Sequence, residues 1–405
     1  MLAVAEAQRL ILQHARPLPP EASQLLTSAL GHVLVETVTA DLDSPPFDKS
    51  MMDGYAIRCA DLPAGQGSLV VMEEIPAGKT PTKPVAAGQA ARIMTGAPIP
   101  DGADAVVVIE RTKMLDDGRV RIEDRPPRPG QNIFRRASEM RQGDVVLAKG
   151  TMLRPQEIGV LATVGRTNVE IVPRPRVCLL STGDEVVEPN QTPGPGQIRN
   201  SNGPMLHAQV CRAGGQPRYL GIARDNIDSL RPLIAEGLLA DVLILSGGVS
   251  AGKLDLVPGV LQEAGVVAQF HKVEMKPGKP VFFGVKIAVK STLVFGLPGN
   301  PVSSFVGFEL FVRPALRRLR GLPEVGMEPT TAALVENFEY RTDRPTYHPA
   351  LLEAIDAGWR VRPVPWSGSP DLRGLTRANA LIVFPPGEHT HSAGQRFPVL
   401  PLGDE

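Results

Sequence analysis

Three glycine-rich segments between positions 241 and 301 carry the residue types best suited to chemistry on an anionic ligand. They are Asp241–Asp255, Lys276–Pro280 and Gly296–Pro301. Short apolar runs that end in glycine are typical of buried parallel strands, and the carboxyl ends of such strands meet at the ligand crevice of a doubly wound sheet. Gly247, Gly248 and Gly299 offer unhindered backbone N–H groups, so we expect them to bind an anion at this edge.

Three carboxylates are expected at the same edge of the sheet. Asp255 lies on the loop after the strand at 242–245, Glu185 follows the strand at 177–180, and Asp225 follows the strand that ends at Ala223. Clustered carboxylates suit a hard divalent cation such as Mg²⁺, so this set predicts a metal site. For Asp255 taken alone, a helix N-cap or a surface acid is an equally good interpretation.

Two lysines flank a tight turn, because Pro277 and Gly278 separate Lys276 from Lys279. Such a turn directs two ammonium groups into one small volume, where like charges repel. We therefore expect an anion between them, with solvated surface lysines as the alternative. Lys272 is a weaker third candidate.

The last helix of this region is predicted to begin at Asn300, with Pro301 at its first position. Its free N–H groups and dipole face the same edge, and Ser303 in the first turn can offer a hydroxyl to an oxyanion. Plain helix capping without a ligand is the alternative. Pro314 is expected to bend this helix.

The hydrophobic pattern predicts four domains. They are an N-terminal helical and extended domain formed by 1–44 with 141–173, a β-rich domain at 45–140, an α/β domain at 174–322, and a β-barrel at 323–405. Helical periodicity covers 3–31, broken at 17–20. Four strands alternate with helices in the third domain, which predicts a doubly wound sheet. Short strands with turn signals predict the second and fourth domains.

Bulk properties exclude several classes of function. The 43 basic residues balance 43 acidic ones, and no apolar run is long enough for a membrane span, so we expect neither nucleic-acid binding nor a membrane location. Three cysteines are too few for a disulfide framework, which favours the cytoplasm. Gly78–Thr80 lacks the leading glycine of a nucleotide-binding loop, and His389 with His391 lacks the further ligands of a zinc site.

Together with Ser181–Glu185 and Ser50–Ala56, the three segments of the 241–301 region closely resemble the molybdopterin molybdenumtransferases, the family of MoeA and the gephyrin E domain. The five motifs occur in the family's order over nearly the whole chain. The resemblance implies a three-layer α/β molybdopterin-binding module with flanking β-rich modules. It also implies that the second domain is inserted into the first.

The resemblance further implies a reaction and its participants. Adenylylated molybdopterin and molybdate would be the substrates, Mg²⁺ the cofactor, and AMP a product. Residues implied to act in catalysis are Asp255, Asp225, Glu185, Lys276, Lys279, Asp53, Thr95 and Glu139. Residues implied to contact substrate are Ser246, Gly247, Gly248, Ser250, Lys272, Pro298, Gly299, Asn300, Pro301 and Ser303. Asp53, Thr95 and Glu139 are expected to serve the partner's site across a homodimer interface.

Three positions depart from the family's pattern. Glu139 stands where aspartate is common, Tyr347–Pro349 where an arginine is usual, and Gly374 where serine is common. Arg344 or Arg373 could compensate. Two other functions stay open: a molybdopterin adenylyltransferase, against which the flanking domains argue, and a non-catalytic pterin-binding or scaffold paralogue. Molybdenum or tungsten, and any molybdoenzyme or cofactor-pathway partner, also stay open.

Overall fold

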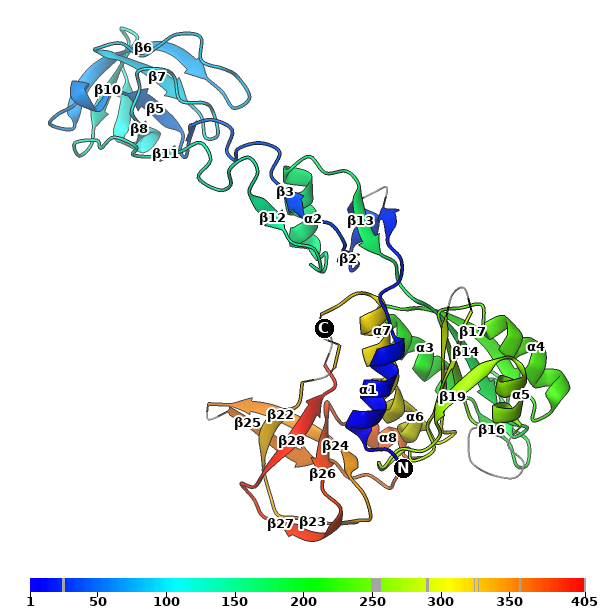
Figure 1. Cartoon of the computed structure of the whole chain (residues 1–405). Helices are drawn as coiled ribbons and strands as arrows, with labels where there is room; N and C mark the ends of the chain where they lie inside the picture. Colours follow the sequence, from blue (N-terminus) through cyan, green and yellow to red (C-terminus); the bar gives the residue numbers. More distant parts are fainter. Residues whose placement is uncertain are drawn as a thin grey trace. The chain divides into compact units, whose positions relative to one another are not determined.

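The computed structural model describes residues 1–405 except 24–25, 249–255, 289–290, 324, 327, 357 and 404–405. The chain divides into two compact units (Figure 1). One unit comprises residues 1–23, 31–35 and 170–405, and the other comprises 24–30 and 36–169. The finer division into four domains stays a prediction. No described helix is both long and apolar enough to cross a membrane.

A six-stranded sheet forms the centre of the first unit, in the order β17-β14-β18-β21-β20-β19. Its strands are β14 (Arg176–Thr182), β17 (Gln216–Ala223), β18 (Val242–Ser246), β19 (Val266–Phe270), β20 (Phe282–Lys286) and β21 (Thr292–Leu297). The first four strands in this order are parallel, as the sequence predicts, whereas β20 is antiparallel to both of its neighbours. Because β19 therefore runs in the direction of β21, the loop at 271–281 leaves the sheet at the same edge as the loop after β18.

Helices cover both faces of this sheet, which gives the three-layer α/β arrangement (Figure 1). One face carries α1 (Val4–His14), α3 (Asn202–Arg212), α6 (Pro301–Gly307), the π-helical turn η4 (Phe308–Val312) and α7 (Arg313–Leu319). The other carries α4 (Ile227–Gly237) and α5 (Val257–Glu263). Alternate strand residues face the two layers, so Leu179 packs in the first core and Leu180 in the second. Cys178 lies in the second core, where burial raises the pKa of its thiol.

Pro314 has a visible effect on the long helix that begins at Pro301. Proline has no N–H and clashes with the carbonyl four residues before it, here that of Leu310. The helix passes through the π-helical turn η4 just before this proline. The freed carbonyl of Leu310 accepts a hydrogen bond of 2.9 Å from Nε2 of Gln8 on α1. The interruption therefore ties α1 to the helix.

The predicted C-terminal β-barrel is confirmed, and five strands close it. They are β22 (Thr330–Leu334), β24 (Thr346–Ile355), β25 (Gly358–Pro363), β26 (Ala380–Phe384) and β28 (Arg396–Pro401). An antiparallel two-stranded pair, β23 (Phe338–Thr342) with β27 (Gly387–His391), and the short helix α8 (Leu372–Leu375) accompany the barrel. Backbone hydrogen bonds attach β24 to the loop after β19, because Lys276 N–H donates to Pro345 and Tyr347 N–H donates to Lys276.

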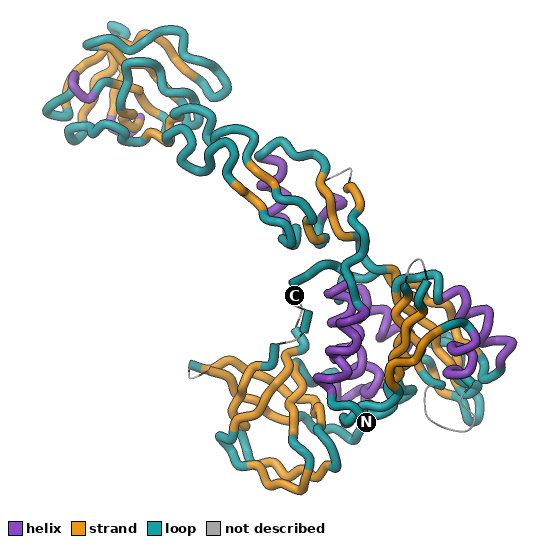
Figure 2. Tube along the Cα trace, viewed as in Figure 1, coloured by secondary structure: helices purple, strands orange, loops and turns teal. Residues whose placement is uncertain are grey.

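The second unit is rich in short strands (Figure 2). Its six-stranded sheet, in the order β8-β5-β7-β6-β10-β9, comprises β5 (Gly54–Ile57), β6 (Gln66–Ile75), β7 (Gln89–Ile93), β8 (Ala105–Val108), β9 (Thr112–Met114) and β10 (Arg119–Glu123). Two-stranded pairs join β4 (Lys49–Ser50) to β11 (Ile133–Phe134) and β3 (Val38–Thr39) to β12 (Val145–Leu147). The helix predicted near 155–162 is present as α2 (Pro155–Thr163).

Among the described residues of 3–31, the predicted periodicity corresponds to one α-helix, α1. After the proline break come β1 (Glu21–Ser23) and a single 3₁₀ turn, η1 (Leu26–Ala29). The segment between Pro20 and Gly31 is too short for a stable helix, and Gly31 ends it with a φ of 75°. The strand β1 joins β13 (Val169–Val172) and β2 (Val33–Leu34) in a small sheet.

Candidate functional site

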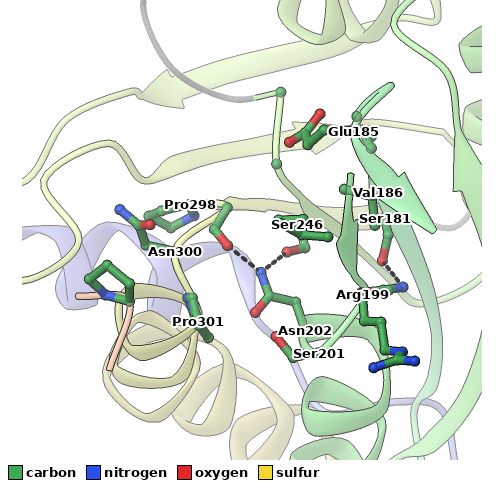
Figure 3. Close-up of a pocket in the computed structure, with 18 of the residues that line it drawn as sticks. Ser181, Glu185, Val186, Arg199, Ser201, Asn202, Ser246, Pro298, Asn300 and Pro301 are labelled. Atoms are coloured by element: carbon green, nitrogen blue, oxygen red, sulfur yellow. Dashed lines mark hydrogen bonds between the residues drawn. The ribbon is translucent and has the colours of Figure 1, made fainter. Parts of the chain in front are cut away.

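A cavity of about 640 Å³ opens at the carboxyl edge of the parallel strands. The ends of β14 and β18, the loop after β21, and the loop that leads into α3 line it (Figure 3). The short strands β15 (Val186–Val187) and β16 (Ile198–Arg199) lie beside it, and Pro370 comes to it from the turn before α8. The cavity therefore lies where a doubly wound sheet is expected to bind ligands.

Most of the predicted loop residues line this one cavity. They are Glu185, Asp225, Ser246, Gly247, Gly248, Pro298, Gly299, Asn300 and Pro301. Two further predicted residues, Ser250 and Asp255, lie outside the described residues. Lys272, Lys276, Lys279 and Ser303 belong to neighbouring segments and are not among the lining residues.

Three carboxylates that repel one another, those of Asp184, Glu185 and Asp225, lie close together at the cavity. Burial is the largest cause that raises the pKa of Asp225, and the carboxylates of Asp184 and Glu185 raise it further. Oδ1 of Asp184 accepts a hydrogen bond of 3.1 Å from the backbone N–H of Asp225, which holds the two loops together. A divalent cation would relieve this repulsion, and hard oxygen donors suit Mg²⁺. Within the described ranges, no group of three acidic, histidine or cysteine residues forms a complete metal site.

The glycines after β18 are needed because two strand ends approach each other closely. A Cβ atom at Gly247 would lie 2.6 Å from the carbonyl oxygen of Thr182, and one at Gly248 would lie 2.7 Å from the Thr182 hydroxyl. The N–H of Gly247 donates to the carbonyl of Leu297 at 3.1 Å. The expectation that this N–H is free for a ligand is therefore wrong, because it closes the sheet instead.

Asn300 stands at the start of α6 without capping it. Its backbone is extended, and its side chain makes no capping hydrogen bond. The side chain lines the cavity instead, beside Pro298 and Pro301 (Figure 3). The interpretation of this residue as a plain side-chain cap does not hold.

The lysine turn packs between α6 and the barrel. The Lys276 ammonium lies 5.6 Å from the centre of the Tyr340 ring, in a cation–π contact. Gly278 packs against Ser303, because a Cβ atom there would lie 3.3 Å from the Ser303 carbonyl oxygen. Ser303 is buried, and Lys272 is exposed. That the ammonium groups of Lys276 and Lys279 share one volume stays a prediction.

The C-terminal residues that depart from the family's pattern make specific hydrogen bonds and close packing contacts. His348 is buried, its Nδ1 lies 2.8 Å from the Pro349 carbonyl, and burial lowers its pKa to about 4, so the ring is neutral. Gly374 donates its N–H to Asp371 at 2.8 Å, and a Cβ atom there would lie 2.9 Å from the same carboxylate. Of the two arginines that could compensate, Arg344 is hydrogen-bonded to Asp343.

Two predicted residues of the second unit contact each other. Asp53 accepts hydrogen bonds from the N–H and the hydroxyl of Thr95 at 2.7 and 2.8 Å, and these bonds lower its pKa. Both residues are exposed. Glu139 takes part in a different contact, because it accepts a hydrogen bond of 2.7 Å from the Ser44 hydroxyl. Its role in a site stays a prediction.

The sequence interpretation missed the segment that leads into α3. Arg199, Asn200 and Asn202 all line the cavity, and both asparagines are buried and hydrogen-bonded to serines at strand ends. The signal available in the sequence was two asparagines close together, Asn200 and Asn202, at the start of a helix. Their distant partners are not visible in the sequence.

Comparison with known proteins covers nearly the whole chain. Three family models match in order: the MoeA N-terminal region (domain I and II) at 2–165, the probable molybdopterin binding domain at 178–318, and the MoeA C-terminal region (domain IV) at 331–402. The cavity residues from the strand ends fall within the second match.

Curated relatives and solved structures agree with these matches. A molybdopterin molybdenumtransferase of Staphylococcus aureus (strain COL) is 35% identical over 97% of this chain and 93% of its own length. One from Nostoc sp. is 38% identical over 93% of this chain and 88% of its own. The crystal structure of the molybdopterin biosynthesis moeA protein from Pyrococcus horikosii is 30% identical, covers 100% of both chains and superposes with a TM-score of 0.80. The chain belongs to the molybdopterin molybdenumtransferase family and acts in molybdenum cofactor biosynthesis.

Proposed function

We propose that this protein transfers molybdenum from molybdate to adenylylated molybdopterin and releases AMP. The observation that carries the proposal is the cavity at the carboxyl ends of β14, β18 and β21, which has two carboxylates on its wall and lies within the match to the probable molybdopterin binding domain. A substrate with phosphate groups and a metal ion needs both carboxylates for the cation and N–H or O–H donors for the anion.

Glu185 and Asp225, together with Asp255, would hold Mg²⁺. The donor set fits this ion, because two acidic side chains line one cavity, and burial together with the neighbouring carboxylates raises the pKa of Asp225. When bound, the ion would neutralise phosphate charge and polarise the bond to be cleaved. No side chain of this protein is needed as a nucleophile.

The remaining residues bind and orient the two substrates. Ser246, Gly248, Gly299 and Asn300 lie on the cavity wall and would hold the adenylate phosphate. Lys276 and Lys279, with Ser250 and Ser303, would hold molybdate through charge-assisted hydrogen bonds. We infer a cytoplasmic location from the cysteines, which are all free.

The working form is a homodimer in this proposal. Asp53 and Thr95 are exposed and fixed to each other, so they are suited to complete the site of a partner chain, with Glu139 as a third contributor. Mixing Asp53→Ala chains with Asp225→Asn chains would then restore one complete site in each mixed dimer. An active protein that sediments only as a monomer would refute the dimer proposal.

The reaction is tested by incubating the purified protein with adenylylated molybdopterin, Mg²⁺ and molybdate and measuring AMP by chromatography. We expect AMP only when molybdate is present, and the same assay with tungstate compares the two metals. A non-catalytic pterin-binding paralogue would bind the substrate without releasing AMP. An adenylyltransferase would instead consume ATP and free molybdopterin.

The lysines are tested in the same assay by titrating molybdate. Each charge-assisted hydrogen bond contributes about 1.5–3 kcal/mol where it is desolvated, so Lys276→Ala and Lys279→Ala should each raise the half-saturating molybdate concentration about 10- to 100-fold. Lys272→Ala is compared in parallel, because Lys272 is the weaker candidate and is exposed on the same loop, and its half-saturating molybdate concentration should change least. Coincident curves for all variants would place the oxyanion site elsewhere.

A further inference from the structure

The side-chain amide of Asn202 clamps two of the strand-end loops at the cavity. Its Nδ2 lies 2.8 Å from the Ser246 hydroxyl at the end of β18 and 2.7 Å from the carbonyl oxygen of Gly299 on the loop after β21. Figure 3 shows the amide nitrogen between these two partners, with the amide oxygen turned away from both. Both loops carry residues that line the cavity.

The partners fix the direction of every hydrogen bond in this clamp. The Gly299 carbonyl can only accept, so the nitrogen of the Asn202 amide must face it. The second proton of this nitrogen then goes to the Ser246 hydroxyl, whose oxygen acts as acceptor. The proton of that hydroxyl must point elsewhere, and within the described ranges the Ser246 hydroxyl has no hydrogen-bond partner besides Asn202. With respect to the described residues, Ser246 therefore has an O–H donor available at the cavity wall.

The Asn202 side chain uses only its N–H groups in hydrogen bonds to the described residues. The residue is 7% exposed, and its Oδ1 has no hydrogen-bond partner within the described residues. A buried carbonyl without a partner is destabilising, so a residue chosen only for stability would not be an asparagine in this environment. Uncompensated polar groups of this kind are expected where function sets the residue.

The ligand that suits this wall is an acceptor. Thr182 lies at the end of the neighbouring strand, and its buried Oγ1 is also without a partner in the described part of the chain. Hydroxyl donors on adjacent strand ends suit the oxygens of a phosphate group. Molybdate is the other oxyanion of the proposed reaction, but the lysines proposed to hold it do not line this cavity.

We propose that Asn202 is a positioning residue that directs the Ser246 O–H to a phosphate oxygen of the adenylate. This inference rests on the proposed function, because it takes the adenylylated pterin as the ligand. Asn202 acts through Ser246 and also fixes the Gly299 loop on the opposite wall. It therefore sets how the phosphate is held, and it contributes nothing to the binding of the nucleoside itself.

The test compares AMP with adenosine by isothermal titration calorimetry on the full chain with Mg²⁺. Ser246→Ala and Asn202→Leu should each weaken AMP binding about tenfold or more, because a hydrogen bond to a charged acceptor is lost. Adenosine binding should change less than about twofold in both variants. The AMP affinity of the double variant should be little lower than that of the single variant that binds AMP more weakly, since both changes remove the same interaction.

Tyr219→Phe is the matched control for a purely structural effect. The Tyr219 hydroxyl accepts a hydrogen bond from Asn200 at 2.8 Å and donates to Glu188 at 3.0 Å, next to the clamp, but Tyr219 is not among the lining residues. Its loss should leave the ratio of AMP to adenosine affinity unchanged. Circular dichroism of each variant checks the fold, and Ser246→Ala tests the hydroxyl on its own if Asn202→Leu does not fold.

Three results would overturn the proposal. They are a wild-type protein that binds AMP no more tightly than adenosine, equal losses for both ligands in the variants, and additive losses in the double variant. Molybdate that competes with AMP in the wild type but not in Ser246→Ala would assign the hydroxyl to molybdate instead. The reaction is assayed in parallel. If the protein prefers AMP to adenosine but releases no AMP in that assay, the proposed function is refuted, whereas the role of Asn202 and Ser246 in binding the phosphate group is not.

Discussion

The buried carboxylate of Glu309 should be the most sensitive single charge in the first unit. Glu309 is 0% exposed and lies in the π-helical turn η4. Its Oε1 accepts hydrogen bonds from Gln209 at 2.7 Å and Arg212 at 2.5 Å, and its Oε2 accepts one from Arg313 at 3.1 Å. Gln209 and Arg212 lie on α3, so this one carboxylate joins two helices whose first residues line the cavity.

Glu309→Gln leaves two guanidinium groups without a counter-charge. Removing one partner of a buried ion pair costs about 3–5 kcal/mol. The Arg313 side chain is 8% exposed and so meets this cost, whereas the Arg212 side chain is 29% exposed and regains some hydration. We therefore expect a loss of about 3 kcal/mol, at the lower end of that range. For a unit of this size the loss corresponds to a fall in Tm of about 6–12 °C.

The assay is thermal unfolding followed by circular dichroism and by tryptophan fluorescence. Trp366 packs against the core that contains η4 and α7, so its emission should report on the affected region. Glu353→Gln is the matched control, because Glu353 pairs with Arg360 at 2.7 Å and both side chains are more than 40% exposed. That change should cost less than about 1 kcal/mol. Equal shifts in Tm for the two variants would refute the reasoning.

Three further predictions concern the cavity and the barrel. Asp225→Asn should raise Tm slightly without Mg²⁺, because it removes the repulsion between neighbouring carboxylates. It should also abolish the stabilisation by Mg²⁺, which for wild type is about 2.7 kcal/mol when the Mg²⁺ concentration is 100 times its Kd. An unchanged response to Mg²⁺ would remove Asp225 from the metal site. His348 has a folded pKa of about 4, lowered from 6.5, so protonation favours unfolding, and the stability of the barrel should fall by about 3 kcal/mol between pH 6.5 and 4. His348→Phe should flatten that dependence in urea titrations at several pH values. Gly374→Ser should cost about 1–3 kcal/mol, because its Cβ would lie 2.9 Å from the Asp371 carboxylate and 3.1 Å from the Pro365 carbonyl, and a variant as stable as wild type would contradict this steric argument.

The sequence was most informative where a local pattern decides the structure. The strands β14, β18 and β21 are continuous apolar runs, so their existence and their parallel direction could be predicted. The strands β19 and β20 were both missed, and for β19 the reason is physical. Residues at the centre of β19 are exposed, and its pattern is not that of a strand buried on both faces. Pairing with β20 at the edge of the sheet decides its conformation.

The candidate site divides in the same way. Glycine and proline mark loops in the sequence itself, so Gly247, Gly248 and the loop at 296–301 could be assigned to one edge of the sheet. The hydrogen-bond partners of their N–H groups could not be predicted, because the N–H of Gly247 donates to the carbonyl of Leu297 on another strand. Asn202 was missed for the same reason, since its partner Gly299 lies 97 positions away. Contacts between distant segments decide which polar group is free for a ligand.

The barrel has a neutral histidine, His348, near Lys276 where the family usually has an arginine. An arginine at 348 or 349 would add a second positive charge close to the Lys276 ammonium, whose charge already disfavours protonation of His348. A neutral histidine removes that repulsion and packs among the rings of Phe338, Tyr340 and Trp366. If Lys276 and Lys279 hold molybdate as proposed, binding of molybdate should then depend more strongly on these lysines than it would with an arginine in the barrel. Of the two arginines that could replace the missing charge, Arg373 is the exposed one, and it lies in α8 three residues after Pro370, which lines the cavity.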